Sequence, residues 1–402
     1  MATSSDRPML VFVSDIHLTD ALHNASIPRV DTFERFWTRI TAARGHRPAH
    51  MCFVGDLFDI VRSPTWLETG MRPYDDPSEA LAARVESIVA AVLAREAPFF
   101  AAIRKRVESG ELTIHYVLGN HDRLLRVAPQ ARRAVWRALT GEDRDVDFGA
   151  ELTFPDHGVL AYHGHRTDPV NYDPEGAATI GDAIGCDLIV GFPRAVRLET
   201  KAPHPELDDI DDVRPIYAVP SWVRHFGTFH PEMLGTIQRT WSGLVEGFLS
   251  GDFIRGWQRR RRSPFSVDTA LKVRLLLELS TKKLIAKGSD RRLTGLYKFV
   301  QHGFDGKMAE AAAAQLRAGE GLRYVVNGHS HFANMTPLGS IDGKPAVYFN
   351  TGTWRSVHQI GHGLGGRPTF LHYDAMSYLV FFPEGDPLGR DYEWWTGSMI
   401  PR

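Results

Sequence analysis

The segment MLVFVSDIH, at residues 9–17, joins a short apolar run to an acidic and an imidazole side chain. An apolar run of this length, Met9–Ser14, is typical of a strand that is buried on both faces. Asp15 and His17 follow it directly. The segment therefore predicts a buried strand with metal-type ligands at its carboxyl end.

This arrangement recurs along the chain. Five short polar segments each follow a predicted strand, and they are Asp15-Ile16-His17, Gly55-Asp56-Leu57-Phe58-Asp59, Gly119-Asn120-His121-Asp122, His163-Gly164-His165 and Gly328-His329-Ser330-His331. In α/β sheets, ligands bind where loops converge at the carboxyl ends of strands. We therefore expect all five segments to meet in one crevice.

The spacing within two segments suggests how their side chains point. In an extended backbone, side chains at i and i+2 lie on the same side. Asp15 and His17 are then able to reach one ion, and so are His329 and His331 if their segment is extended. If the chain turns between them, these two histidines face different ions.

The candidate ligands combine imidazole, carboxylate and amide groups. Glycine directly precedes three of them, Asp56, Asn120 and His329, and permits a tight turn before each. The full set is Asp15, His17, Asp56, Asn120, His163, His329 and His331. Such a set suits Mn, Fe, Zn, Co or Ni better than an all-oxygen Mg or Ca site. Seven ligands are too many for one ion, whereas two ions that share a carboxylate use them all.

Further patterns define the expected fold around these segments. Helical apolar spacing is found over Val30–Arg44 and from Ser78 to about Glu108, with a break at Pro98. Additional strands are predicted at Met51–Val54, Leu112–Leu118, Val159–Tyr162 after a hairpin-like stretch Val146–Phe154, Arg323–Val326 and Ala346–Phe349. Phe370–Phe382 is predicted to supply the last one or two strands. Residues between about 170 and 320 are helical and rich in aromatics. We expect an α/β core formed by 1–170 and 320–402, and a helical, basic cap insertion at 171–319. The acidic stretch Pro203–Pro215 is predicted to be a loop at the start of the cap.

Composition fits a soluble enzyme located in the cytoplasm. The 402-residue chain is long enough for two domains or for one domain with an insertion. No apolar run approaches the roughly 18 residues of a membrane span, and Met1–Pro8 is too polar for a secretory signal peptide. The two cysteines, Cys52 and Cys186, do not provide a disulfide framework, which favours a reducing compartment.

A basic block lies within the insertion. From Arg255 to Lys298 there are thirteen Lys or Arg and three Asp or Glu, although the whole chain has a net charge of −1. Four interpretations stay open: a cap helix with a solvated basic face, a lid over an anionic substrate, a peripheral membrane surface, or a nucleic-acid site in which Trp257 and Phe265 stack on bases.

Taken as a set, the motifs DxH, GDxxD, GNHD, HGH and GHSH resemble the calcineurin-like metallophosphoesterases over roughly 9–170 and 320–382. SDIHL, GDLFDI, GNHDRLL and the segment Asn350–Trp354 are similar to the branch containing the UDP-2,3-diacylglucosamine pyrophosphatases. The chain departs from that branch at His165, where Asp is usual, and in a longer segment between His163 and His329. The resemblance implies a two-sheet β-sandwich flanked by helices.

The resemblance also implies how the ligands divide between two divalent ions. The first ion takes Asp15, His17 and His331, the second takes Asn120, His163 and His329, and Asp56 bridges them. Manganese is the expected metal.

Catalytic and substrate-binding roles follow from the same resemblance. His121 matches the catalytic histidine and Asp122 the residue that orients it, while Asp59 is expected to bond a ligand histidine. His163 is expected to be the ligand rather than His165. We assign substrate contacts to His165 and Arg123.

The expected activity is metal-dependent hydrolysis of a phosphodiester or pyrophosphate bond. A metal-bound hydroxide attacks and His121 acts as general acid on an anionic, phosphate-containing substrate. A nuclease with the same dinuclear site is the alternative. A non-catalytic scaffold is disfavoured, because a scaffold would be free to lose the ligands and His121. The sequence does not indicate an oligomeric state.

Overall fold

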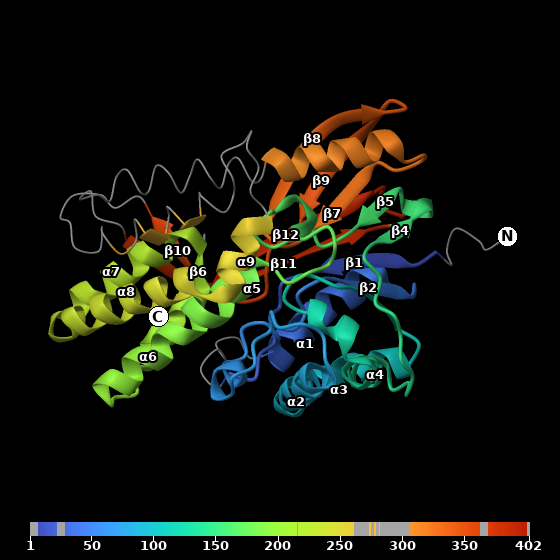
Figure 1. The fold of residues 1–402 in the computed structure, drawn as a ribbon. Coiled ribbons are helices and arrows are strands. Elements are labelled where there is room, and N and C mark those ends of the chain that lie inside the picture. Colours follow the sequence, from blue (N-terminus) through green and yellow to red (C-terminus); the bar gives the residue numbers. More distant parts are fainter. Residues whose placement is uncertain are drawn as a thin grey trace.

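Two β-sheets pack face to face and helices cover their outer sides (Figure 1). The computed structural model describes residues 7–21, 29–214, 216–260, 273–274, 277–278, 281, 306–361 and 369–399. The predicted fold class, a mixed α/β sandwich flanked by helices, is confirmed.

The first sheet has the strand order β3-β2-β1-β11-β10-β6, with β12 paired to β11. Its strands are β1 (Met9–Val13), β2 (Ala49–Val54), β3 (Leu112–Val117), β6 (Val213–Arg214), β10 (Ser356–Gly361), β11 (Thr369–Phe381) and β12 (Tyr392–Met399). Strands β1, β2 and β3 are parallel, so their carboxyl ends share one edge.

The second sheet has the order β4-β5-β7-β9-β8. Its strands are β4 (Leu152–Phe154), β5 (Val159–Ala161), β7 (Tyr324–Asn327), β8 (Asn334–Ile341) and β9 (Lys344–Asn350). Strands β5, β7 and β9 are parallel.

Strand β1 shows how the layers are built from a sequence that is apolar at every position. Leu10 and Phe12 point into the core between the two sheets, while Met9, Val11 and Val13 point to the helices on the other side. This period of two is the geometry of a strand that is buried on both faces. The two-sided burial explains why the run MLVFV contains no polar residue.

Helices cover both outer faces. The first sheet packs against α1 (Arg29–Arg44), α2 (Glu79–Arg95), α3 (Ala97–Glu108) and α4 (Pro129–Thr140). The second sheet packs against the helix at 306–318, through Met308, Ala312 and Leu316. The predicted break in the long helical stretch lies at Glu96, where α3 starts with a proline in its first turn.

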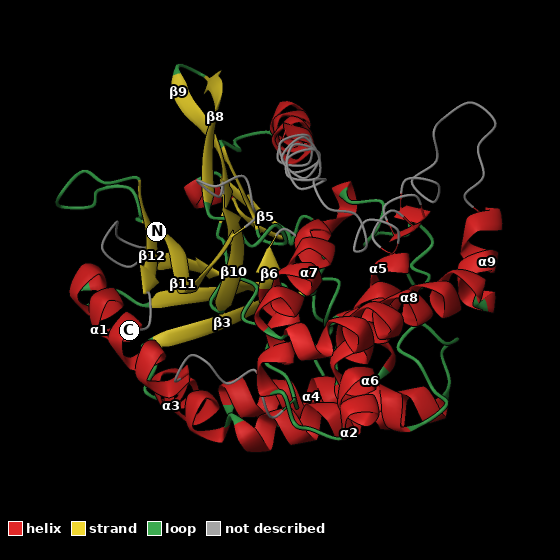
Figure 2. Cartoon of the chain, turned by 90° about the vertical axis from the view of Figure 1, so that its left-hand side faces the viewer, coloured by secondary structure: helices red, strands yellow, loops and turns green. Residues whose placement is uncertain are grey.

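The middle of the chain forms a separate cluster of helices with its own apolar core (Figures 1 and 2). Its main helices are α5 (Ile180–Ala183), α6 (Gly191–Thr200), α7 (Val219–Phe229), α8 (Leu234–Ser250) and α9 (Asp252–Arg260), with a π-helical stretch, η6 (Ile184–Val190), between α5 and α6. None of the described helices is long and apolar enough to cross a membrane. The domain boundaries stay a prediction.

The predicted loop Pro203–Pro215 is wrong. It contains the 3-10 helix η7 (Pro205–Asp212) and strand β6, which pairs with β10 in parallel through Val213 and Arg214. The open edge of β10 supplies hydrogen-bond partners that local composition does not reveal.

Several other elements depart from the sequence prediction. Helix α4 and strands β8, β10 and β12 were not predicted, and the last predicted stretch is one strand, β11. Strands β8 and β12 are largely exposed, so their apolar pattern is weak.

Most of the basic block, including Phe265, lies outside the described residues, although Trp257 on α9 is buried.

Candidate metal centre

The seven candidate ligands come from loops at the carboxyl ends of five strands. Asp15 and His17 follow β1, Asp56 follows β2 and Asn120 follows β3 in the first sheet, whereas His163 follows β5 and His329 and His331 follow β7 in the second. The loops of both sheets meet at one edge of the sandwich, as the distances between their side chains show.

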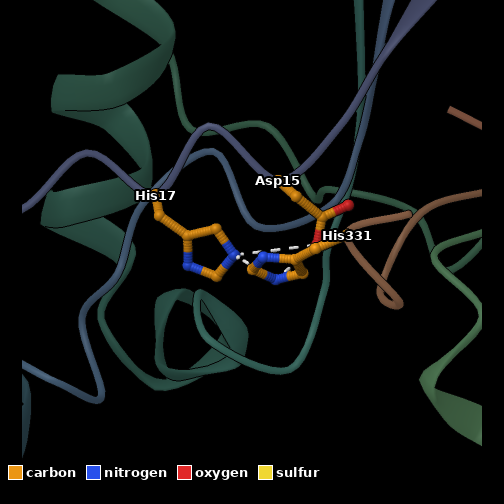
Figure 3. A group of neighbouring side chains, drawn as sticks. All are labelled: Asp15, His17 and His331. Carbon is orange, nitrogen blue, oxygen red and sulfur yellow. Dashed lines mark hydrogen bonds and ion pairs between the residues drawn. The ribbon is translucent and has the colours of Figure 1, made fainter. Parts of the chain in front are cut away.

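Asp15, His17 and His331 form the first group (Figure 3). The Nε2 atoms of His17 and His331 are 3.0 Å apart, and Asp15 Oδ1 lies 3.6 and 3.4 Å from them. Metal–nitrogen bonds of about 2.1 Å separate neighbouring ligand atoms by about 3.0 to 3.4 Å in octahedral or tetrahedral geometry. The three atoms are therefore spaced as ligands of one cation.

Asp56, His163 and His329 form the second group. His163 Nε2 lies 3.2 Å from Asp56 Oδ2 and 3.1 Å from Asn120 Oδ1. Asp56 Oδ2 is also 3.7 Å from His17 Nε2 of the first group. The carboxylate of Asp56 thus stands between the two groups, as a bridging ligand would.

Two carboxylate oxygens in the centre are buried without a hydrogen-bond partner: Asp15 Oδ1 and Asp56 Oδ2. The other oxygen of each carboxylate accepts backbone N–H groups, from His329 at 2.9 Å and from His121 at 2.9 Å respectively. A buried, unsatisfied carboxylate oxygen is costly. The two oxygens face imidazole nitrogens on the side where a cation would satisfy both, so these residues fit a pair of divalent metal ions.

Three of the candidate ligand histidines are held by an oxygen acceptor on their second ring nitrogen. His17 Nδ1 contacts Asp59 at 3.1 Å, His163 Nδ1 contacts the carbonyl of Val54 at 2.8 Å, and His329 Nε2 contacts Asp168 at 3.1 Å. This arrangement fixes the ring and leaves the other nitrogen for a metal. The contact of Asp59 with a ligand histidine was predicted, while Asp168 was missed because its spacing does not distinguish it from an ordinary loop residue.

Five of the candidate ligands adopt left-handed backbone conformations. The φ angles are 52° at Asp15, 52° at His17, 54° at Asp56, 74° at His329 and 63° at His331. Each such residue costs roughly 1–2 kcal/mol, and such strain concentrates at functional sites. The predicted extended geometry at Asp15–His17 is therefore wrong, and the two side chains converge through turns instead.

The turn at Ser330 sends its neighbouring histidines to different groups. His331 joins Asp15 and His17, whereas His329 joins Asp56 and His163. Of the two arrangements that the sequence left open, the structure has the bent one.

The glycines of the motifs make room for carboxylates. A Cβ atom at Gly119 would collide with Asp56, and one at Gly328 would collide with Asp15. Neither glycine has a positive φ, so close approach, and not the predicted turn geometry, is what requires glycine there. These two positions set how closely the strands of the site approach each other.

The predicted pairing of His121 with Asp122 is wrong. His121 Nδ1 lies 2.7 Å from Asp59 Oδ1, so Asp59 contacts both His17 and His121. Asp122 instead accepts hydrogen bonds from its surroundings: Gly119 N–H at 2.6 Å, Leu57 N–H at 3.1 Å and Tyr116 O–H at 2.7 Å. Burial, together with the charge of Asp56, raises the pKa of Asp122 to about 7. Asp122 therefore ties the loops after β2 and β3 together.

The two predicted substrate contacts have different surroundings. The ring of His165 lies 5.4 Å from that of His163 and 6.3 Å from that of His329, and burial and His163 hold its pKa well below the usual value. Arg123 is paired with Asp182 of helix α5 at 2.8 Å. His165 is thus beside the metal groups, whereas Arg123 joins the core to the helical insertion. Both substrate roles stay predictions.

Sequence reasoning missed a set of buried arginines beside the centre. They are Arg62 after β2, Arg214 in β6 and Arg355 just before β10. Arg62 lies against His121, and Arg214 Nε donates to His331 Nδ1 at 3.0 Å. No spacing signal links these three positions, because tertiary pairing of the insertion brings them together.

The charges in the centre are strongly coupled. Burial opposes the charge of Asp56, but His163, His121 and His17 outweigh it and hold the pKa of Asp56 well below its usual value. Burial likewise opposes the charged form of His163, but Asp56 outweighs it and raises the pKa of His163 to about 10. In the absence of metal, protonated His163 therefore supplies positive charge beside the Asp56 carboxylate.

Comparison with known proteins agrees with this geometry. Residues 9–185 match the family model of the calcineurin-like phosphoesterases. No curated protein matches the chain. The matched domain and the His/Asp groups support a metal-dependent phosphoesterase, which is a hydrolase of phosphoester bonds. His329 and His331 lie beyond the matched residues, and the structure brings them to the same centre.

Substitution of Gly119 by alanine tests the close approach to Asp56. We expect Gly119→Ala to reduce the bound divalent metal by at least half after dialysis, measured by mass spectrometry, because the added methyl group displaces the Asp56 carboxylate. Gly243→Ala is the matched control, since a Cβ there meets nothing within 4 Å and helix α8 favours alanine. Full metal content in Gly119→Ala would contradict the bridging position of Asp56.

Metal binding is expected to release protons. His163, with a pKa of about 10, is protonated in the metal-free protein at pH 7 and must lose that proton to become a ligand. Metal affinity should therefore rise with pH up to about pH 10. Calorimetric titration with Mn²⁺ in buffers of different ionisation enthalpy measures the released protons. A binding enthalpy that is the same in all buffers would count against this assignment.

Proposed function

We propose that this chain hydrolyses a phosphodiester or pyrophosphate bond at a dinuclear divalent metal centre. The first ion would be held by Asp15, His17 and His331 and the second by Asn120, His163 and His329, and Asp56 would be shared. One observation carries the proposal: two buried carboxylate oxygens, neither of which accepts a hydrogen bond, face a cluster of imidazole nitrogens at ligand spacing.

When bound, such a metal pair supplies a water nucleophile that is activated at neutral pH and neutralises charge on the phosphate. The mixed imidazole, carboxylate and amide set suits manganese, with Fe, Zn, Co or Ni as alternatives. The proposal includes no covalent phospho-enzyme.

His121 is the proposed general acid. Asp59 contacts its Nδ1 at 2.7 Å, so Nε2, which lies 3.2 Å from Arg62 Nη2, is the nitrogen that would face a substrate oxygen. The ring lies 4.8 Å from that of His17, which places it beside the first group. A proton delivered from Nε2 to the leaving oxygen, followed by its replacement from solvent, completes the role. Asp59 acts as a positioning residue for both His121 and His17.

A nuclease with the same centre is the second candidate, because of the thirteen Lys and Arg between residues 255 and 298. Contacts of that block with nucleic acid would weaken steeply with salt, whereas hydrolysis of a small substrate would not. The likeness to the UDP-2,3-diacylglucosamine pyrophosphatases makes a nucleotide- or lipid-linked pyrophosphate the first substrate class to examine. A cytoplasmic location, with or without contact to a membrane surface, completes the proposal.

A substrate panel tests the activity. Mn-loaded protein is incubated with a phosphomonoester, a phosphodiester, a nucleoside-diphosphate conjugate, a cyclic nucleotide and single-stranded DNA. We expect hydrolysis of the diester or the diphosphate conjugate, and its loss in Asp56→Ala together with the metal. No hydrolysis of any member by protein with two bound metals would refute the enzyme proposal.

The general-acid role has a sharper test. We expect His121→Ala to retain both metals and to lose roughly 10²–10⁴-fold in kcat on a substrate with a poor leaving group. The loss should shrink for a nitrophenyl ester, whose leaving oxygen needs no proton. His46→Ala is the matched control, because His46 is exposed on the loop after α1. An equal loss on both substrates would show that His121 does not act as an acid.

A further inference from the structure

Three buried arginines gather beside the first metal group. Arg62, Arg214 and Arg355 are 7%, 5% and 5% exposed. Packing like charges together out of water is unfavourable unless each has a compensating partner. The hydrogen-bond and ion-pair partners of each guanidinium therefore indicate its role.

Two of the three have carboxylate partners. Arg62 pairs with Asp59 at 3.1 Å and with Asp211, and Arg355 pairs with Asp211 at 2.8 Å and Asp212 at 2.5 Å. Asp211 and Asp212 come from η7, so the insertion supplies these counter-charges.

The contacts of Arg214 are different, because its acceptors are uncharged. Its Nη1 donates to the carbonyls of Asp211 and Val213, both at 2.8 Å, and its Nε donates to His331 Nδ1 at 3.0 Å. The two carbonyl contacts and the pairing of β6 with β10 anchor the residue firmly. The remaining contact, from Nε to His331, is the one that could be exchanged for another acceptor without moving the residue.

That contact is incompatible with a metal on His331. An arginine Nε–H is only a donor. If His331 binds a cation through Nε2, which faces Asp15 and His17, its Nδ1 carries the ring hydrogen and is a donor as well. The other ligand histidines have oxygen acceptors at this position, from Asp59, Val54 and Asp168. Metal at the first group therefore leaves Arg214 Nε without its acceptor.

Arg62 has a similar contact at the other end of the same row of rings. Its Nη2 lies 3.2 Å from His121 Nε2, the nitrogen that must carry a proton for general-acid catalysis. The rings of His121, His17 and His331 follow one another at 4.8 and 4.7 Å. Arg62 and Arg214 thus lie on either side of the first metal group. Each contacts an imidazole nitrogen that would carry a hydrogen in the metal-bound enzyme and so could not accept a hydrogen bond.

We propose that Arg214 is a substrate-binding residue, contributed by the insertion, whose Nε–H passes from His331 to an anionic phosphate oxygen once metal is bound. The inference rests on the proposed function. A phosphate oxygen is the strong acceptor that the reaction brings to this place, and a guanidinium anchored through Nη1 is suited to meet it. The insertion thereby contributes directly to recognition of the phosphate.

The test measures phosphate binding separately from turnover. Mn-loaded wild type, Arg214→Gln and the control Arg239→Gln, an exposed arginine of helix α8, are titrated with inorganic phosphate by calorimetry. Metal content is measured on the same samples by mass spectrometry. We expect Arg214→Gln to keep two metals per chain and to bind phosphate at least tenfold more weakly, while Arg239→Gln matches wild type.

The outcomes separate this inference from the proposed function. Unchanged phosphate affinity in Arg214→Gln would overturn the inference, and so would a loss of metal, which would make Arg214 a support for His331. If Arg214→Gln does not fold, Arg214→Lys replaces it, because lysine keeps the charge but lacks the Nε–H. We expect Arg214→Lys to show a smaller loss of phosphate affinity. A phosphate affinity equal to that of wild type would overturn the inference. Because phosphate binding requires no hydrolysis, an inactive wild type that binds metal and phosphate would refute only the proposed activity.

Discussion

The buried carboxylates of Asp15 and Asp56 are the constraint around which the rest of this structure is arranged. Each has one oxygen satisfied by backbone N–H groups and one oxygen that faces imidazole nitrogens without a hydrogen bond. Two negative charges at this depth require positive charge close by. In the metal-free chain a protonated His163 supplies part of it, and a pair of divalent cations would supply it fully. The sandwich edge, where strands from both sheets end, is where the chain brings all of these groups together.

The backbone around the ligands departs from favourable conformations for the same reason. Left-handed φ angles at five ligand positions and the tight approach at Gly119 and Gly328 bring the side chains closer than relaxed strand ends would. Such strain persists only when the surrounding structure holds it in place. Here the holding contacts are those of Asp122, which accepts from three groups on the loops after β2 and β3 and on β3 itself, and those of the buried strands behind them.

Sequence patterns predicted which candidate ligands come together, but they missed most of the residues that support them. A ligand such as Asp56 or His163 directly follows an apolar strand, and the carboxyl ends of strands converge, so local pattern is sufficient. Asp59 as the partner of His121, and Asp168 as the partner of His329, depend on distances across the fold that no spacing encodes. Strand β6 was missed for a related reason, because its pairing is supplied by the edge of β10 and not by its own residues.

The charge balance indicates what the assembled site attracts. Arg62 and Arg355 pair with Asp59, Asp211 and Asp212, whereas the acceptors of Arg214 are uncharged. Two divalent cations would bring four positive charges against the three carboxylates of Asp15, Asp56 and Asp168, and so would leave positive charge in a buried place. An anionic phosphate would balance this charge. Asp211 and Asp212 lie in η7 and Arg214 lies in β6, so the pairing of β6 with β10 is what brings these charged groups beside the candidate metal centre.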